Sequence, residues 1–216
     1  IIKLKKIMDY KNLLIRAFVT LILLLIYFLL FSINDNLIIY LIIIIYLIIL
    51  IEILFYFIIL KNILVLYIVL SFFFFILYYN YYFNIIEFNL LILTIIIFDI
   101  SSYLVGNFLG KKKIFKYISP NKTYFGLIGG ILLSNIFSIF YILYFSNKVV
   151  LDNIFLINFI IIFAFIGDIL ESYFKRKNKL KNSSNFLPGH GGFLDRFDSF
   201  IFAIIFLLIY RAILSI

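Results

Sequence analysis

The sequence has 216 residues, of which 66% are hydrophobic and 13% are charged, and its formal net charge is +9 at pH 7. Together with a mean hydropathy of +1.22, this composition excludes an ordinary soluble globular domain and predicts an all-α integral membrane protein. Cysteine is absent, which excludes a disulfide framework and a thiolate site.

Apolar runs follow one another from Leu13 to Ile216. Most have the length needed to cross about 30 Å of hydrocarbon. The lysine-rich start has the charge pattern of a secretory signal, but its apolar run is long and lacks a small-x-small cleavage site, so we interpret it as a retained first span. We therefore predict about seven transmembrane helices, at Leu13–Phe31, Leu37–Leu60, Ile63–Tyr79, Leu90–Phe108, Gly126–Phe145, Ile154–Leu170 and Phe200–Leu214.

The basic residues fall mainly on one side of this topology. With seven spans, 17 of the 19 Lys and Arg residues share one face, and only Lys148 and Arg211 lie elsewhere. The positive-inside rule makes that face cytoplasmic, with the N-terminus inside and the C-terminus outside. The charge is thus explained without a nucleic-acid partner. Two basic cytoplasmic loops, residues 109–125 and 171–199, either attract lipid headgroups or meet around a polyanion in a polar active-site cavity.

The positions of the predicted spans and of the two basic loops divide the chain into two domains. Residues 1–89 form about three N-terminal transmembrane helices. Residues 90–216 form a catalytic membrane domain of about four spans that includes both basic loops. Within residues 1–89, Glu52 lies midway along the second predicted span, and the sequence assigns it no role.

Polar side chains form stripes on two predicted spans. In the fourth span the stripe begins at Asp99 and continues through residues spaced i+3, i+4, i+7 and i+11: Ser102, Tyr103, Gly106 and Gly110. In the sixth span Asp168 is followed at i+3, i+4 and i+7 by Glu171, Ser172 and Lys175. This spacing places each set on one helical face. Because ionisable groups are costly in lipid, we expect both stripes to face the bundle interior.

Asp195, Asp198 and Ser199 again share a face at the start of the seventh span, beside Arg196. A single Asp at a span end is usually a helix cap or the partner of a lysine. Four Asp residues from three spans around one mouth indicate instead a hard divalent cation such as Mg²⁺, which neutralises neighbouring carboxylates. Adjacent lysines and arginines suit phosphate oxygens.

The single histidine, His190, lies in the segment "PGHGG". It is either a loop residue that bonds to backbone or part of a phosphate-handling loop. Gly189, Gly191 and Gly192 favour the second interpretation because glycines permit an anion-binding backbone. The start of the next helix adds amides that favour an anion. The glycines of "GLIGG", residues 126–130, suit either close approach to a ligand or helix packing.

Residues 172–198 resemble the long C-terminal signature of the CDP-diacylglycerol synthase (phosphatidate cytidylyltransferase) family. The matching positions are Ser172, Lys175, Arg176, Lys181, Pro188, His190, Gly191, Gly192, Phe193, Asp195, Arg196, Phe197 and Asp198. A second block is similar from Asp99 to Tyr103, at Gly106 and Gly110, and through Ile118, Ser119, Pro120, Lys122, Thr123, Gly126, Gly129 and Gly130. The sequence departs from the family pattern at Asn182 and Phe125, where the family has Asp and Glu, and at Ser101 and Ser102.

The resemblance implies transfer of CMP from CTP to phosphatidic acid, giving CDP-diacylglycerol and pyrophosphate. It implies Asp99, Asp168, Asp195 and Asp198 as ligands of one or two Mg²⁺ ions. Catalytic roles fall to Asp168, Asp195, Asp198, Lys175 and Arg176, and substrate binding to Ser172, Lys122, Lys181, His190, Gly191, Gly192 and Arg196. The expected location is the bacterial inner membrane, with the active site facing the cytoplasm and a homodimer left open.

Other functions remain open. A CTP-dependent lipid-phosphate transferase or polyprenol kinase would use similar residues, and the changes at Asn182 and Phe125 are compatible with a decayed homologue. A small multi-span transporter also fits the composition. It predicts ionisable residues near the bilayer midplane and an internal repeat, and the sequence has no convincing repeat.

Overall fold

The computed structural model describes residues 22, 25–27, 29–34, 36–146, 151–187 and 191–214. Helices dominate this part of the chain, and a short two-stranded sheet interrupts them. The elements are α2 (Leu37–Tyr56), α3 (Lys61–Tyr82), α4 (Ile85–Leu109), β1 (Lys113–Phe115), β2 (Ser119–Thr123), α5 (Tyr124–Ser146), α6 (Leu151–Lys177) and α7 (Leu194–Leu214).

The predicted all-α membrane fold is confirmed. Within the described residues, α2, α3, α4, α5 and α6 are each long and apolar enough to cross a membrane. The first predicted span, Leu13–Phe31, lies largely outside the described residues. The last, Phe200–Leu214, is helical within α7, which falls outside that group of five.

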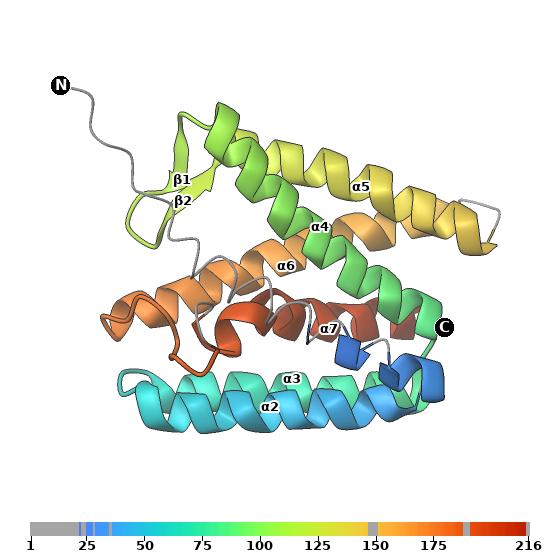
Figure 1. Ribbon diagram of the computed structural model, residues 1–216, viewed down its shortest axis with the longest axis horizontal. Coiled ribbons are helices and arrows are strands. Elements are labelled where there is room, and N and C mark those ends of the chain that lie inside the picture. Colours follow the sequence, from blue (N-terminus) through green and yellow to red (C-terminus); the bar gives the residue numbers. More distant parts are fainter. Residues whose placement is uncertain are drawn as a thin grey trace.

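Helix α7 forms the centre of the bundle (Figure 1). The α2–α3 pair lies on one side of it, α4 and α6 lie on the other, and α5 packs on the far side of α4. Burial follows this order, because α7 contributes fully buried residues such as Ile201 and Ile204. An apolar helix buried among other helices also explains why polar groups at its start are held inside the protein.

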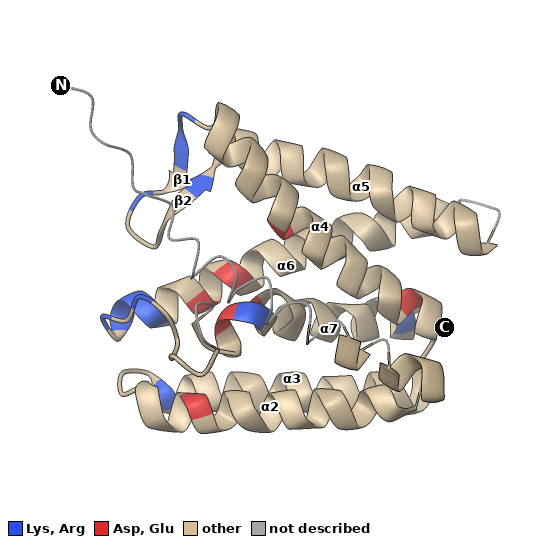
Figure 2. Cartoon of the chain, in the orientation of Figure 1, with Lys and Arg blue, Asp and Glu red and all other residues tan. Residues whose placement is uncertain are grey.

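The basic loops meet at one end of the bundle, as predicted. Figure 2 shows lysine and arginine gathered where α4 ends, where β1 and β2 lie, and where α6 ends and α7 begins. The loop 109–125 contains the antiparallel β1–β2 hairpin, which the sequence analysis did not predict. Helix α6 continues to Lys177, so the predicted loop 171–199 begins with about two turns of helix.

The start of α5 is fixed by a hydrogen bond and by close packing against α4. The Gly126 amide donates to Thr123 Oγ1 at 3.1 Å, which satisfies an amide that the helix itself leaves unpaired. A Cβ at Gly126 would stand 2.6 Å from the Ser102 carbonyl oxygen. Glycine at this position of "GLIGG" therefore serves helix packing, the second of the two predicted alternatives.

Candidate active site

Three carboxylates form an acidic cluster, which we define as Asp168, Glu171 and Asp198. One oxygen from each lies within 4.8 Å of the others. The i, i+3 spacing on α6 supplies the first two, and the first turns of α7 supply the third. Glu171 and Asp198 are buried, and Glu171 Oε1 has no hydrogen-bond partner among the described residues. Closely spaced buried carboxylates repel one another, so this donor set suits a hard divalent cation.

Two lysines lie directly against the acidic cluster. Lys122 Nζ, from β2, is 2.6 Å from Asp168 Oδ2 and 4.5 Å from the centre of the Phe165 ring. Lys175 Nζ is 2.6 Å from Glu171 Oε2. These ammonium groups neutralise part of the negative charge and come from the two basic loops, so the hairpin and the end of α6 contribute to one site.

Asp195 lies on the other side of Lys175. Its Oδ1 is 2.7 Å from Lys175 Nζ, and its Oδ2 accepts hydrogen bonds of 2.9 Å from the Ser183 and Gly192 amides. Burial raises the pKa of Asp195, but the Lys175 ammonium and the hydrogen bond from the Gly192 amide help to bring that pKa below its usual value. Asp195 was predicted as a metal ligand, and the structure places it outside the acidic cluster, against Lys175 and backbone amides.

Asp99, the fourth predicted ligand, lines a pocket of about 220 Å³ between α4, β2 and α6. Asp168 and Lys122 line the same pocket, so Asp99 faces the acidic cluster from α4 without belonging to it. The complete lining combines polar and apolar side chains: Phe98, Asp99, Ser102, Tyr103, Ser119, Asn121, Lys122, Thr123, Leu127, Phe165 and Asp168. Such a mixed lining suits an amphiphilic ligand.

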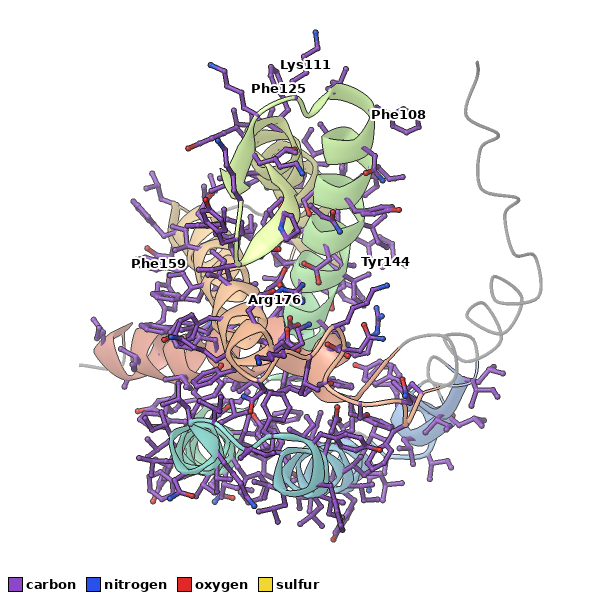
Figure 3. The ribbon with its side chains drawn as sticks, turned by 90° about the vertical axis from the view of Figure 1, so that its left-hand side faces the viewer. Phe108, Lys111, Phe125, Tyr144, Phe159 and Arg176 are labelled. Carbon is purple, nitrogen blue, oxygen red and sulfur yellow. The ribbon has the colours of Figure 1, made fainter. Side chains whose placement is uncertain are left out.

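The Arg176 side chain donates hydrogen bonds to backbone carbonyl oxygens rather than to a carboxylate. Its Nε donates to the Ile118 carbonyl oxygen at 3.3 Å, and its Nη1 donates to the Leu180 carbonyl oxygen at 2.9 Å. In Figure 3, which views the molecule from the end that carries the loops, Arg176 lies beside the hairpin. These contacts tie the two loops together. The other predicted binding residues differ in their surroundings. Ser172 donates a hydrogen bond to Asp168 Oδ1 at 3.4 Å, while the side chains of Lys181 and Arg196 are exposed.

The Gly191 and Gly192 amides, which follow His190, both donate hydrogen bonds within the protein. The Gly191 amide donates to the Leu187 carbonyl oxygen, and the Gly192 amide donates to Asp195. The first amide of α7, that of Leu194, donates to Glu52 Oε2 at 3.2 Å. In the structure these three amides are hydrogen-bonded within the protein, and the anion-binding role of Gly191, Gly192 and the helix start stays a prediction. His190 lies outside the described residues.

Sequence reasoning missed two residues of the site. Glu171 was placed on the polar stripe but not among the metal ligands, although it lies three residues after Asp168. Glu52 was left without a role, and it is fully buried against the start of α7. Its only sequence signal is that it is the single charged residue in the predicted span Leu37–Leu60.

Residues 1–214 match the model of the cytidylyltransferase family. The chain belongs to this family. Among its relatives, a phosphatidate cytidylyltransferase of Bacillus subtilis (strain 168) is 42% identical over 118 residues, which cover 54% of this chain and 44% of the relative. The Staphylococcus saprophyticus enzyme of that name is 41% identical over 107 residues, and the Staphylococcus aureus (strain COL) enzyme is 45% identical over 109 residues. Each match covers 49% of this chain and 41% of the relative. The matched region therefore spans less than half the length of these cytidylyltransferases.

Proposed function

We propose that the protein transfers the CMP group of CTP to the phosphate of phosphatidic acid, giving CDP-diacylglycerol and pyrophosphate. The observation that carries the proposal is the acidic cluster with Lys122 and Lys175 against it, in a chain that belongs to the cytidylyltransferase family. The names of the bacterial relatives support phosphatidate as the acceptor.

The chemistry requires two anions to meet. A phosphatidate oxygen attacks the α-phosphorus of CTP in line with the departing pyrophosphate, so charge neutralisation and orientation supply most of the catalysis. Lys122 and Lys175 are placed to bind phosphate oxygens, because each already lies within 3 Å of a carboxylate of the cluster. Arg196 and Lys181 are exposed at the same end and extend the cationic surface for the triphosphate.

Mg²⁺ fits the acidic cluster. Asp168, Glu171 and Asp198 offer three oxygens within 4.8 Å, and Glu171 Oε1 is buried with no hydrogen-bond partner in the described part of the chain. When bound, Mg²⁺ neutralises charge on phosphate oxygens. Asp99 and Asp195, which were predicted as further ligands, lie beside the cluster and are proposed to hold the surrounding lysines and pocket wall in place.

The pocket beside Asp99 and Asp168 is proposed to receive the lipid phosphate. Its apolar side chains, such as Phe98 and Leu127, belong to helices that are long and apolar enough to cross a membrane. Acyl chains can therefore remain in the bilayer while the headgroup enters. The basic loops assign this end to the cytoplasm by the positive-inside rule, which gives the site access to CTP.

The test is incorporation of label from CTP into chloroform-extractable lipid by the purified protein with phosphatidic acid and Mg²⁺. Label in the α-phosphate is expected to enter the lipid, and label in the γ-phosphate is expected to leave as pyrophosphate. Transfer of the γ-label to the lipid would instead identify a lipid kinase. Omission of phosphatidate is expected to abolish incorporation.

Asp198→Ala tests the site, and Asp152→Asn is the matched control. Asp152 is an acidic residue in the first turn of α6, far along the same helix from Asp168 and Glu171. The first variant is expected to lose incorporation and the second to retain it. Equal incorporation by wild type and Asp198→Ala would contradict the proposed site. No incorporation by folded wild type across several divalent metals would favour a decayed homologue.

A further inference from the structure

Glu52 is a carboxylate buried in α2, with a side chain that is 0% exposed. A buried charged group in an apolar helix is costly unless its oxygens are used. Its Oε2 accepts a hydrogen bond from the Leu194 amide across 142 residues of sequence. Leu194 is the first residue of α7, and the positive end of a helix dipole stabilises a carboxylate there.

The other oxygen of Glu52 faces the glycine loop. A Cβ at Gly192 would stand 1.7 Å from Glu52 Oε1 and 2.2 Å from Ser183 Oγ. No side chain larger than hydrogen fits between these atoms. Glu52 Oε1 therefore lies beside Ser183 and Gly192, at the two ends of the segment that leads into α7, and has no hydrogen-bond partner among the described residues.

Asp195 holds the same segment from a second position. It accepts hydrogen bonds from the Ser183 and Gly192 amides, and its other oxygen pairs with Lys175, which pairs with Glu171. Glu52 and Asp195 thus hold neighbouring parts of the same backbone, at Leu194 and at Gly192, and Asp195 is joined through Lys175 to Glu171 of the acidic cluster. Residue 198 lies one turn after Leu194 on α7, so a displacement of Leu194 also displaces Asp198.

We propose that Glu52 is a positioning residue for the active site. It fixes Ser183, Gly192 and the first turn of α7, and through them it places Asp195 against Lys175 and Asp198 in the acidic cluster. Helix α2 thereby belongs to the functional unit, although residues 1–89 were predicted as a separate set of helices. The kinetic part of this inference rests on the proposed cytidylyltransferase activity, whereas its conformational part does not.

A reporter on the loop tests the conformational part. The chain has no cysteine, so a single Asn185→Cys substitution in the exposed part of the loop carries one nitroxide spin label. Glu52→Ala is expected to increase the mobility of the label, and Glu52→Gln, which keeps an acceptor oxygen, is expected to restore the wild-type spectrum. Ile49→Ala is the matched control, because Ile49 is also 0% exposed and lies on the same helix.

A second variant approaches the contact from the loop. Gly192→Ala leaves α2 unchanged but places a methyl group against the Glu52 carboxylate, and it is expected to mobilise the label as Glu52→Ala does. This variant keeps the test decisive if Glu52→Ala does not fold. An unchanged spectrum in the folded Glu52→Ala or Gly192→Ala protein, or an equal change in Ile49→Ala, would overturn the proposal.

Kinetics separate positioning from general destabilisation. In Glu52→Ala, kcat for CMP transfer is expected to fall roughly tenfold or more, as for other misplacements of reacting groups. The KM for CTP is expected to change far less than kcat, and Glu52→Gln is expected to recover most of the rate. A rate loss that Ile49→Ala reproduces would overturn the positioning role. If the labelled parent has no transferase activity, the proposed function fails while the spectra still decide the role of Glu52.

Discussion

The two ends of the helix bundle both carry buried or partly buried ion pairs, but positive and negative charges balance at only one of them. Where α7 ends and α4 begins, Arg211 pairs with Glu87, one charge against one. At the opposite end, the salt bridges of the described residues join two lysines to Asp168, Glu171 and Asp195, and Asp198 makes none. A balanced pair leaves no charge uncompensated, whereas surplus carboxylates in a buried cluster favour a cation that binds from outside. We therefore expect the first end to serve the fold and the second end to bind a ligand.

The largest expected effect comes from removing one surplus carboxylate. Asp198→Asn keeps the size of the side chain and is expected to reduce CMP transfer about 100- to 1000-fold, in the range for loss of one electrostatic contact in a transition state. Its thermal stability without metal is expected to stay level or rise, since one like charge is gone. Assays of transfer and thermal unfolding on the same preparation check both. A fall in stability together with activity would mean that Asp198 serves the fold.

Removing a cation from the same end is expected to have the next largest effect. Lys122→Met keeps a long chain over Phe165 but loses the ammonium group that lies 2.6 Å from Asp168. A hydrogen bond to a charged group is worth about 1.5–3 kcal/mol, so kcat/KM is expected to fall roughly 10- to 100-fold. Lys122→Arg is the control and is expected to keep more activity. Steady-state kinetics with CTP varied would contradict the assignment if both variants matched wild type.

Divalent metal is expected to stabilise the protein through only one end of the bundle. Mg²⁺ at about one hundred times its dissociation constant is expected to stabilise the folded protein by about 2.7 kcal/mol. Asp168→Asn is expected to lose this stabilisation and Glu87→Gln to retain it, because only the first residue belongs to the acidic cluster. Thermal unfolding with Mg²⁺ and after chelation measures the difference. Equal stabilisation of both variants would place the metal elsewhere.

The smallest effect on activity is expected at the balanced end. Arg211→Met leaves Glu87 without its partner, and both side chains are partly buried, at 28% and 19% exposure. Stability is expected to fall by about 1–3 kcal/mol, between the values typical of exposed and buried pairs. CMP transfer per folded molecule is expected to remain unchanged. A selective loss of activity at full stability would show that this end also takes part in the reaction.

Much of the site could be predicted because its residues repeat at helical spacing. Asp168, Ser172 and Lys175 were placed on one face of a helix, and the structure puts them there. The two basic loops were expected at one end, and they meet through contacts such as Arg176 to the Ile118 carbonyl oxygen. The β1–β2 hairpin was not predicted, because its sequence has no alternating apolar pattern and the strands are only three and five residues long.

The membrane class, the polar helix faces and the end of the bundle at which charge collects can be predicted from the sequence, since they follow from local composition and period. Which carboxylates share a centre depends on how the helices pack. Glu171 joins Asp168 and Asp198, while Asp195 turns toward Lys175 and two amides. The same packing places Glu52 of α2 beside Leu194, the first residue of α7. Spacing along a helix fixes which side chains share a face, but the rotation and crossing of packed helices fix which faces meet.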